Sequence, residues 1–259
     1  MKIYDLRTDG VYVPVRYYHH AHCGKVVLVG MLHVAEKNCY EQIRCILEKC
    51  DAVIYEEPFP RDDTIMEELD REWASVLFDE NVDEAFLAAI HLPMPPQKFI
   101  QDHGLRQGAH SFDYNQPHWV SGDGTWGVEK DATLPEEAWG HIRQRIKSVD
   151  TALKIEKINS VKAFLVQVNA GIASMRDYVE CRNHHEEAIQ KLVHQQTIVD
   201  PRDNVTFHVF DQTVEIRKPS RIGIQFGNGH IEHMDQLLRE RAYLPTSTKW
   251  LRALTFTQI

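Results

Sequence analysis

Features typical of membrane and secreted proteins are missing from this sequence of 259 residues. No apolar run approaches the roughly 20 residues needed to cross a bilayer, because charged and amide side chains interrupt the best candidate, residues 161–179. Near the start, Asp5, Arg7 and Asp9 occupy positions where a signal peptide would need an apolar core. We therefore expect a soluble protein with no membrane span.

The sequence also has few cysteines and no excess of basic charge. Its five cysteines include no CxxC pair, which argues against a disulfide framework and favours reduced thiols in the cytoplasm. Acidic residues number 38 against 29 Lys and Arg, a net charge of −9. Without a basic stripe to offset phosphate charge, nucleic acid is not an expected partner.

The most informative stretch runs from residue 25 to residue 58. Its apolar run 26–29 predicts a buried strand, Gly30 ends that run, and His33 follows. From Glu36 onward, apolar residues recur at helical spacing, and a second apolar run then ends in Glu56 and Glu57. This is the strand–helix–strand pattern of a parallel sheet, in which ligands bind outside the carboxyl ends of the strands. We expect His33 and Glu56 to face the same crevice.

A similar unit recurs near the end of the chain. The strand-like run 221–226 is followed by Gly227-Asn228-Gly229-His230, which repeats the Gly-x-x-His spacing of Gly30 to His33. Apolar residues from Ile231 onward then follow a helical period. Two copies of a strand–GxxH–helix unit indicate a shared site far more strongly than one copy does.

These two units predict the fold class. We expect an α/β fold in which helices flank a central sheet that is mixed and largely parallel, with antiparallel strands at its edges. The stretches 11–18 and 251–256 predict two of those outer strands, and residues 206–217 alternate in the manner of a further strand or hairpin. Because the two halves of the proposed site must come together, residues 1–259 are expected to form a single domain.

The two GxxH motifs resemble those of the TraB/PrgY/Tiki family, whose members are regarded as metal-dependent hydrolases or peptidases. The family is similar in plan to erythromycin esterases and ChaN-like proteins. Its strand-ending Glu matches Glu56, its Arg-Asn pair late in a long helix matches Arg182 and Asn183, and its glycines match Gly30 and Gly227. The resemblance implies a peptidase-like hydrolase for this chain.

The residue types allow such chemistry. His33, Glu56 and His230 make a two-histidine, one-carboxylate set suited to zinc, manganese, cobalt or iron, with a position left open for water. Glu57 is either a base for that water or a group on the opposite face of the strand. Glycines at 30, 227 and 229 would let a peptide or small-molecule substrate approach exposed backbone N–H groups at the helix starts. His233, one turn from His230, is either an extra ligand or a surface residue.

Two other interpretations of the site remain open. The same residues would serve a metal-independent esterase with His33 as general base, or a binding protein that captures a peptide or another ligand without turnover. Metal content and turnover with and without a chelator would separate the three. The sequence identifies neither the substrate nor the metal nor the oligomeric state.

A long central helix supplies the argument for Arg182. Apolar residues from Val161 to Val179 recur at helical spacing, and the same spacing next reaches Arg182. A guanidinium on a core-facing stripe needs a partner, because an unpaired buried charge is costly. We expect Glu56 or Glu57 to be that partner, with Arg182 either positioning Glu56 or stabilising an oxyanion. If the helix has left the core by this point, Arg182 is simply solvated.

Other segments carry weaker expectations. Helices are predicted over 62–78 and 82–90, and another from Pro135 to about Lys157, before the long helix that begins at Ser160. Residues 98–126 are expected to be irregular, either as a substrate-facing lid or as an ordinary loop. The cluster of His19, His20 and His22 is expected to be a polar hairpin turn rather than a metal site.

Overall fold

The structure, a computed structural model, describes residues 4–57, 75–78, 81–91, 95–123, 136–183 and 200–256. The chain divides into two compact units. Residues 1–59, 106–133 and 199–259 form the first unit, and residues 60–105 and 134–198 form the second. The expected α/β fold class is confirmed, whereas the single domain over residues 1–259 stays a prediction.

The first unit is built on a mixed sheet. Among the described residues it contains seven strands in the order β1-β2-β3-β8-β5-β7, with β9 also paired to β2. The pairs β3–β8, β8–β5 and β5–β7 are parallel, whereas β2 is antiparallel to β1, β3 and β9. The strands are β1 Asp5–Arg7, β2 Gly10–His20, β3 Gly24–Met31, β5 Ala52–Tyr55, β7 Trp119–Ser121, β8 Arg221–Gly227 and β9 Leu244–Thr255.

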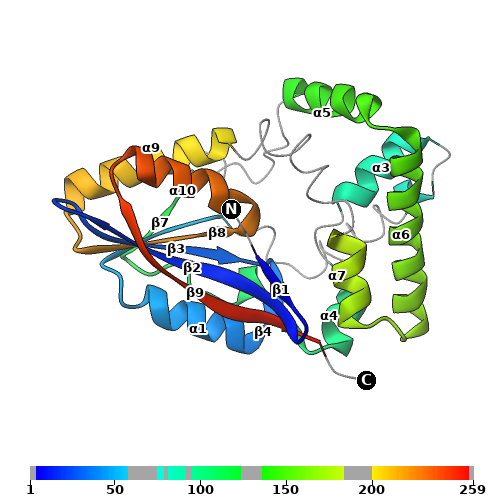
Figure 1. Cartoon of the computed structure of the whole chain (residues 1–259), viewed down its shortest axis with the longest axis horizontal. Coiled ribbons are helices and arrows are strands. Elements are labelled where there is room, and N and C mark those ends of the chain that lie inside the picture. Colours follow the sequence, from blue (N-terminus) through cyan, green and yellow to red (C-terminus); the bar gives the residue numbers. More distant parts are fainter. Residues whose placement is uncertain are drawn as a thin grey trace. The chain divides into compact units, whose positions relative to one another are not determined.

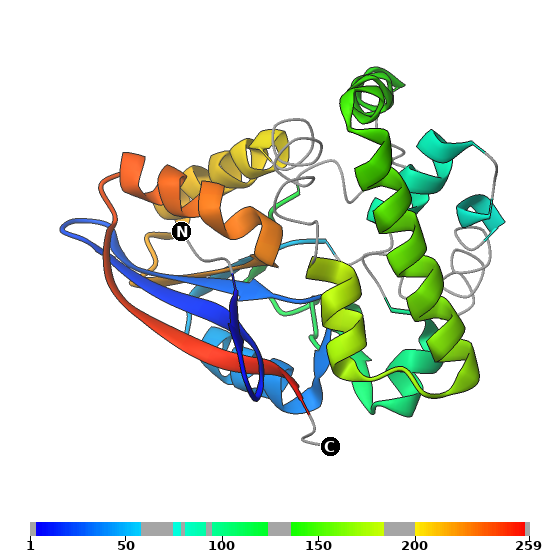
Figure 2. The same ribbon diagram turned by 45° about the vertical axis from the view of Figure 1, so that its right-hand side comes forward.

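Helices cover both faces of this sheet, which explains why its central strands are continuous apolar runs. Figures 1 and 2 show α9 and α10 on one face and α1 on the other. Residues Val26 to Val29 of β3 are all 0–1% exposed. The bounds of the smaller elements and helices are β4 Val34–Glu36, α1 Lys37–Leu47, β6 Leu105–Gln107, η1 Gly108–His110, α9 Asp200–Arg217, η4 Asn228–His230 and α10 Ile231–Glu240.

Strand register places the carboxyl ends of the parallel strands together. Met31, the last residue of β3, pairs with Gly227, the last residue of β8. Tyr55, which ends β5, pairs with both Gln225 of β8 and Ser121 of β7. The loops that follow these strands therefore leave the sheet at the same end, the carboxyl end of the parallel strands.

The second unit is helical among its described residues. Its core joins Phe86 and Ala88 of α3 to Ile146 of α5 and to Ile158 and Val161 of α6. In a second set of contacts, the ring of Phe99 of α4 meets Phe164 edge to face and Tyr178 at a tilt, with ring centroids 5.3 and 5.5 Å away. The helices are α3 Val82–His91, α4 Gln97–Asp102, α5 Glu136–Ser148, α6 Thr151–Ala170 and α7 Met175–Asn183.

The prediction of one long helix that carries Arg182 is wrong in its bounds. The prediction of a helix from Pro135 to about Lys157 is also wrong, because α5 ends at Ser148 and α6 begins at Thr151 rather than at Ser160. Asp150 separates the two helices and caps α6 by accepting from the backbone N–H groups of Ala152 and Leu153. Helix α6 ends before Gly171, whose φ of 70° lies in the left-handed region that ends helices. Arg182 lies on the separate helix α7, so it does not continue one apolar stripe from Val161.

The strand predicted over residues 206–217 is also wrong, because this segment belongs to helix α9. Its buried positions Asp203, Thr206, Phe207, Phe210 and Thr213 recur every three or four residues. They form one helical face, which packs in a core cluster with β8 and α10. Packing of this face has overridden the strand propensity of the valines and threonines.

Several other expectations are confirmed. The strand expected over 11–18 lies within β2, the helix expected over 82–90 lies within α3, and the strand expected over 251–256 matches the end of β9 up to Thr255. Most of the helix expected over 62–78 falls outside the described residues. Residues 98–123 contain α4, β6, η1 and β7 as well as loops, and 124–126 fall outside the described part.

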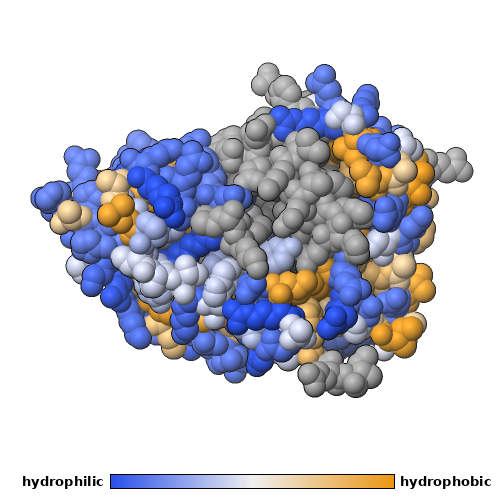
Figure 3. Space-filling view, viewed as in Figure 1, coloured by the Kyte–Doolittle hydropathy of each residue, from blue (hydrophilic) through white to orange (hydrophobic). Residues whose placement is uncertain are grey.

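The surfaces of the two units differ in character. On α6 the apolar residues Leu153, Ile155 and Val166 are exposed, and Figure 3 shows hydrophobic surface over this helix. The side of the first unit seen in that view is mostly hydrophilic. In the part of the chain that the structure describes, no helix combines the length and the apolar character needed to cross a membrane. All five cysteines are free thiols.

Candidate functional site

The candidate site lies where β3, β5 and β8 end. Glu56 directly follows β5, His33 follows β3 after one intervening residue, and His230 ends the short helix η4 after β8. The sequence reasoning placed His33 and Glu56 at one crevice because parallel strands share a functional edge. The structure brings both to this end of the sheet, together with His230, which the second GxxH unit predicted for the same site.

Glu56 is the centre of the site, with only 4% of its surface exposed. Its Oε2 accepts from the backbone N–H of Gly227 at 2.6 Å, and its Oε1 accepts from Arg202 Nη2 at 3.1 Å. His230 Nε2 lies 3.4 Å from the same Oε1. Burial alone would raise the pKa of Glu56, but His230, Arg202 and His33 outweigh it and hold that pKa well below its usual value.

His33 meets Glu56 beside Gly227. A Cβ added to Gly227 would lie 3.1 Å from Glu56 Oε2 and 3.3 Å from His33 Nε2. Both side chains therefore approach the space that the glycine leaves empty. The His33 carbonyl also accepts from Gly108 N–H at 2.7 Å, which fixes the backbone that carries the ring.

Gly30, the glycine of the first motif, also leaves room for a side chain of the other motif. A Cβ on Gly30 would lie 2.3 Å from Oδ1 of Asn228, which belongs to the second motif. Each motif thus uses its glycine to admit a side chain of the other: Asn228 against Gly30, and His33 against Gly227. This interlock gives the repeated Gly-x-x-His spacing a structural cause.

Asn228 is buried without compensation. It is 7% exposed, and within the described residues neither its Oδ1 nor its Nδ2 has a hydrogen-bond partner. Buried amide groups are normally paired, so its place beside Gly30 is held at a cost.

His230 is held from behind by a carboxylate. Its Nδ1 donates to Asp203 Oδ1 at 2.5 Å, while its Nε2 faces Glu56. Burial opposes a charge on this ring, yet Glu56 and Asp203 prevail and raise the pKa of His230 to about 9. The ring is therefore charged at neutral pH while Glu56 is ionised.

Sequence reasoning missed Arg202 and Asp123, which complete the site. Arg202 donates to Asp123 Oδ1 from Nε at 3.0 Å and from Nη2 at 2.7 Å, and so bridges Asp123 and Glu56. Asp123 Oδ2 accepts from the N–H of Glu57 at 2.6 Å. Desolvation raises the pKa of Asp123 in spite of Arg202. The pKa values of Asp123 and Glu56, which share one guanidinium, are therefore shifted in opposite directions.

The donor chemistry of His33, Glu56 and His230 fits a transition metal. Two imidazole nitrogens and a carboxylate make a ligand set typical of zinc, and a carboxylate behind His230 is the usual partner of a metal-bound histidine. As the described residues are arranged, however, no group of three or more His, Cys, Asp or Glu forms a metal-binding cluster. Both oxygens of Glu56 are already bonded, to Arg202 and Gly227.

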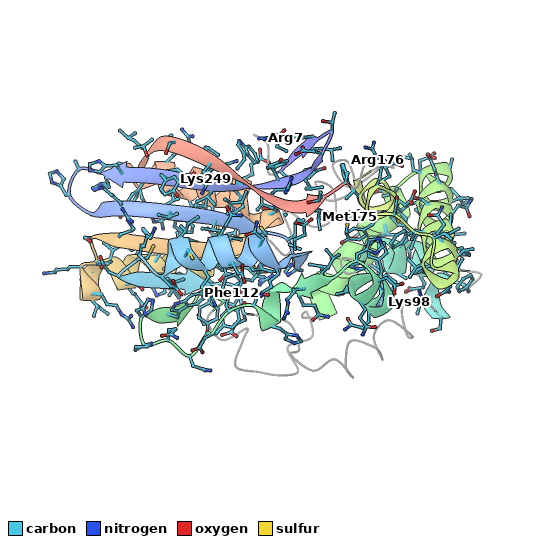
Figure 4. All side chains as sticks on the ribbon, turned by 90° about the horizontal axis from the view of Figure 1, so that it is seen from below. Arg7, Lys98, Phe112, Met175, Arg176 and Lys249 are labelled. Carbon is cyan, nitrogen blue, oxygen red and sulfur yellow. The ribbon has the colours of Figure 1, made fainter. Side chains whose placement is uncertain are left out.

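Other predicted residues lie elsewhere or outside the described side chains. Glu57 Oε1 accepts from Tyr55 at 3.4 Å; Tyr55 belongs to an aromatic cluster with Tyr114, Trp119 and Phe112, the last labelled in Figure 4. The arginine on Glu56 is Arg202, whereas Arg182 and Asn183 end helix α7 of the second unit. The side chains of Arg182 and Asn183 are not among those described, so their roles stay predictions.

The histidine cluster forms a hairpin turn, as expected. His20 Nδ1 accepts from the backbone N–H groups of His22 and Cys23 at 3.1 and 2.9 Å. The turn lies between β2 and β3, where His20 pairs with Gly24. These bonds hold His20 Nδ1 in the turn itself.

Comparison of the chain with family models, with curated proteins and with solved structures finds no match at any of the three levels. The interpretation of the site therefore depends on its geometry and its residue types.

Proposed function

We propose that this protein is a hydrolase that cleaves amide or peptide bonds at the site formed by His33, Glu56 and His230. One observation carries the proposal: His33 Nε2 and Glu56 Oε2 both lie within 3.3 Å of the position that a Cβ on Gly227 would take, and His230 Nε2 lies 3.4 Å from Glu56. A buried cluster of ionisable groups with perturbed pKa values, at the carboxyl ends of parallel strands, is the usual setting of an α/β active site.

In the first form of the proposal, His33, Glu56 and His230 hold a divalent transition metal such as zinc, manganese or cobalt. Bound there, the ion would polarise a carbonyl and activate a water molecule. Asp203 would orient His230 from Nδ1, and Arg202 would orient Glu56. Binding would require His230 to give up the proton that Glu56 and Asp203 now favour.

A second form needs no metal, and a specific observation favours it. Glu56 already accepts from Arg202 and Gly227, and His230 beside it is charged at neutral pH. In this form His33 acts as general base towards water, and the His230 imidazolium stabilises the oxyanion of a tetrahedral intermediate. The substrate class is the same, so the two forms differ only in their response to metal.

The proposal extends to the setting of the protein. A peptide or small molecule is the expected substrate, and the net charge of −9 argues against nucleic acid as a partner. Five free cysteines support a reducing compartment, so we place the protein in the cytoplasm.

The deciding experiment combines metal analysis with turnover. Purified protein is analysed for metal and then assayed on a peptide library as isolated, after chelation, and after addition of zinc, manganese or cobalt. Loss of activity on chelation with recovery on addition supports the metal form. Activity that ignores both supports the metal-free form, and no turnover in any arm contradicts the hydrolase proposal.

Variants make this test specific. His33→Asn should abolish turnover in either form, whereas His208→Asn should not, because His208 is an exposed histidine of α9 bonded to Gln212. Thermal melting gives a second readout for metal. An ion present at a hundred times its Kd raises the free energy of unfolding by about 2.7 kcal/mol, and His33→Asn should reduce that gain.

A further inference from the structure

Asp203 of α9 binds two histidines with its two oxygens, His230 at the end of η4 and His233 in α10. Its Oδ1 accepts from His230 Nδ1 at 2.5 Å, and its Oδ2 accepts from His233 Nδ1 at 3.0 Å. Asp203 is 0% exposed, and the side chain of His233 is 16% exposed. The carboxylate thus lies entirely inside, between a buried ring and a ring nearer the surface.

The helices place these groups by their periodicity. His230 precedes α10 directly and His233 lies three residues later, so the two rings project from the same side of that helix. Asp203 lies on the inward face of α9, together with Thr206, Phe207 and Phe210. Its neighbour Arg202 reaches Glu56, so consecutive residues of α9 support Glu56 and His230.

Hydrogen-bond chemistry determines the orientation of the rings. An ionised carboxylate only accepts, so both histidines present Nδ1–H to Asp203. His230 is then left with Nε2 directed at Glu56, 3.4 Å away. The terminal torsion of an aspartate is broad, so a single bond from His230 would leave the carboxylate plane poorly fixed. The second bond, from His233, fixes that plane.

We propose that Asp203 is the positioning residue of His230 and that His233 extends the candidate site by fixing Asp203. This role rests on the proposed function of His230 in hydrolysis. The geometric part of the inference does not, because it concerns the hydrogen bond between His230 and Asp203 in the protein as purified.

The first test therefore needs no substrate. With histidine side chains labelled with ¹⁵N, the proton on His230 Nδ1 should give a slowly exchanging resonance that is missing from His230→Asn. In His233→Asn the amide nitrogen takes the place of Nδ1 and can still donate to Asp203, so the resonance should persist. In His233→Leu the donor is gone, and the resonance should be lost.

Controls separate positioning from folding. His208→Leu makes the same change at an exposed histidine of α9 and should keep the resonance. If His233→Leu does not fold, His233→Gln replaces it, because its amide nitrogen lies at the place of Nε2 rather than Nδ1. A resonance that survives equally in His233→Asn and in the variant without a donor at Nδ1 would overturn the inference.

The second test uses the peptide that the library screen selects. His233→Leu should lower kcat about tenfold to a hundredfold with little change in KM, as is usual when a supporting residue is lost, and His233→Asn should restore most of it. Equal kcat in the two variants contradicts the inference. A chain with no turnover at all contradicts only the proposed function, since the resonance test still decides the role of Asp203.

Discussion

Replacing Arg202 by Met should destabilise the protein more than other arginine changes on its surface. The guanidinium donates to Glu56 at 3.1 Å and to Asp123 at 2.7 Å, and both carboxylate side chains are at most 5% exposed. Met fills the space of the aliphatic stem but leaves both charges without their cation. Removing one partner of a buried ion pair costs about 3–5 kcal/mol. The backbone N–H groups of Gly227 and Glu57 still bind the two carboxylates, which keeps the loss within that range.

The matched control is Arg241→Met. Arg241 donates to both oxygens of Asp211 at 2.9 Å, but the two side chains are 30% and 51% exposed. An exposed pair contributes about 0–1 kcal/mol, so this variant should unfold at nearly the urea concentration of the parent. Arg182→Met belongs in the same series, because it shows whether the arginine of α7 also carries stability.

The pH dependence of the Arg202→Met effect gives a second check. The folded pKa of Glu56 is depressed, so its stabilisation is present above the unfolded pKa of about 4.3 and is lost as the pH falls through the folded value. The gap between parent and Arg202→Met should therefore be widest at neutral pH and should narrow in acid. A loss no larger than that of Arg241→Met at pH 7 would refute the buried network.

Three further predictions concern the motifs. Gly227→Ala should lower turnover, because the new Cβ would force His33 and Glu56 apart. In Gly229→Ala the Cβ would meet nothing within 4 Å, so the free energy of unfolding should stay within about 0.5 kcal/mol of that of the parent. Gly30→Ala should destabilise by about 1–3 kcal/mol, because its Cβ would lie 2.3 Å from a side-chain atom of the second motif; unchanged urea unfolding would contradict the interlock. For metal-free protein, the charged ring of His230, with its pKa raised to about 9, stabilises fully below about pH 6.5. The melting temperature should then fall as the pH rises through 9. If His230→Asn shows the same fall in melting temperature at alkaline pH, the prediction is contradicted.

The local pattern of the sequence was enough to predict the first half of the site. The apolar run at 26–29, the glycine that ends it, and the helical spacing after Glu36 are signals that depend on neighbours in the chain. Parallel pairing then implied that His33 and Glu56 share an edge, as they do. His230 could be added because its unit repeats the same order of strand, glycine, histidine and helix.

Helix α9 could not be predicted from residue propensities. Because the helix was not predicted, Arg202 and Asp203 were not recognised as site residues. Residues 206–217 are rich in valine and threonine, which favour strands on their own. The decisive signal was the spacing of Asp203, Phe207 and Phe210, which forms one helical face only when the segment is extended back to residue 200. A segment interpreted as a strand from residue 206 leaves both charged residues in a preceding loop.

The break between α6 and α7 did have a local signal. Gly171 is a typical helix end, and Ser174 begins a capping box in which Asp177 accepts from Ser174 N–H at 2.7 Å and Ser174 Oγ accepts from Asp177 N–H at 3.2 Å. Asp123 had no such signal. Its role depends on β7 lying beside β5, a pairing between segments more than sixty residues apart in the chain.

The position of β8 between β3 and β5 has a consequence for how the chain folds. Strands β3 and β5 are neighbours in the sequence of the central sheet but have no hydrogen bonds to each other, because β8, near the end of the chain, pairs with both. During synthesis the apolar edge of β3 must wait for most of the protein to be made, and pairing over so long a separation is slow. Until β8 arrives, that edge is an attractive template for other chains, so the nascent protein should depend on chaperones more than its size alone would suggest.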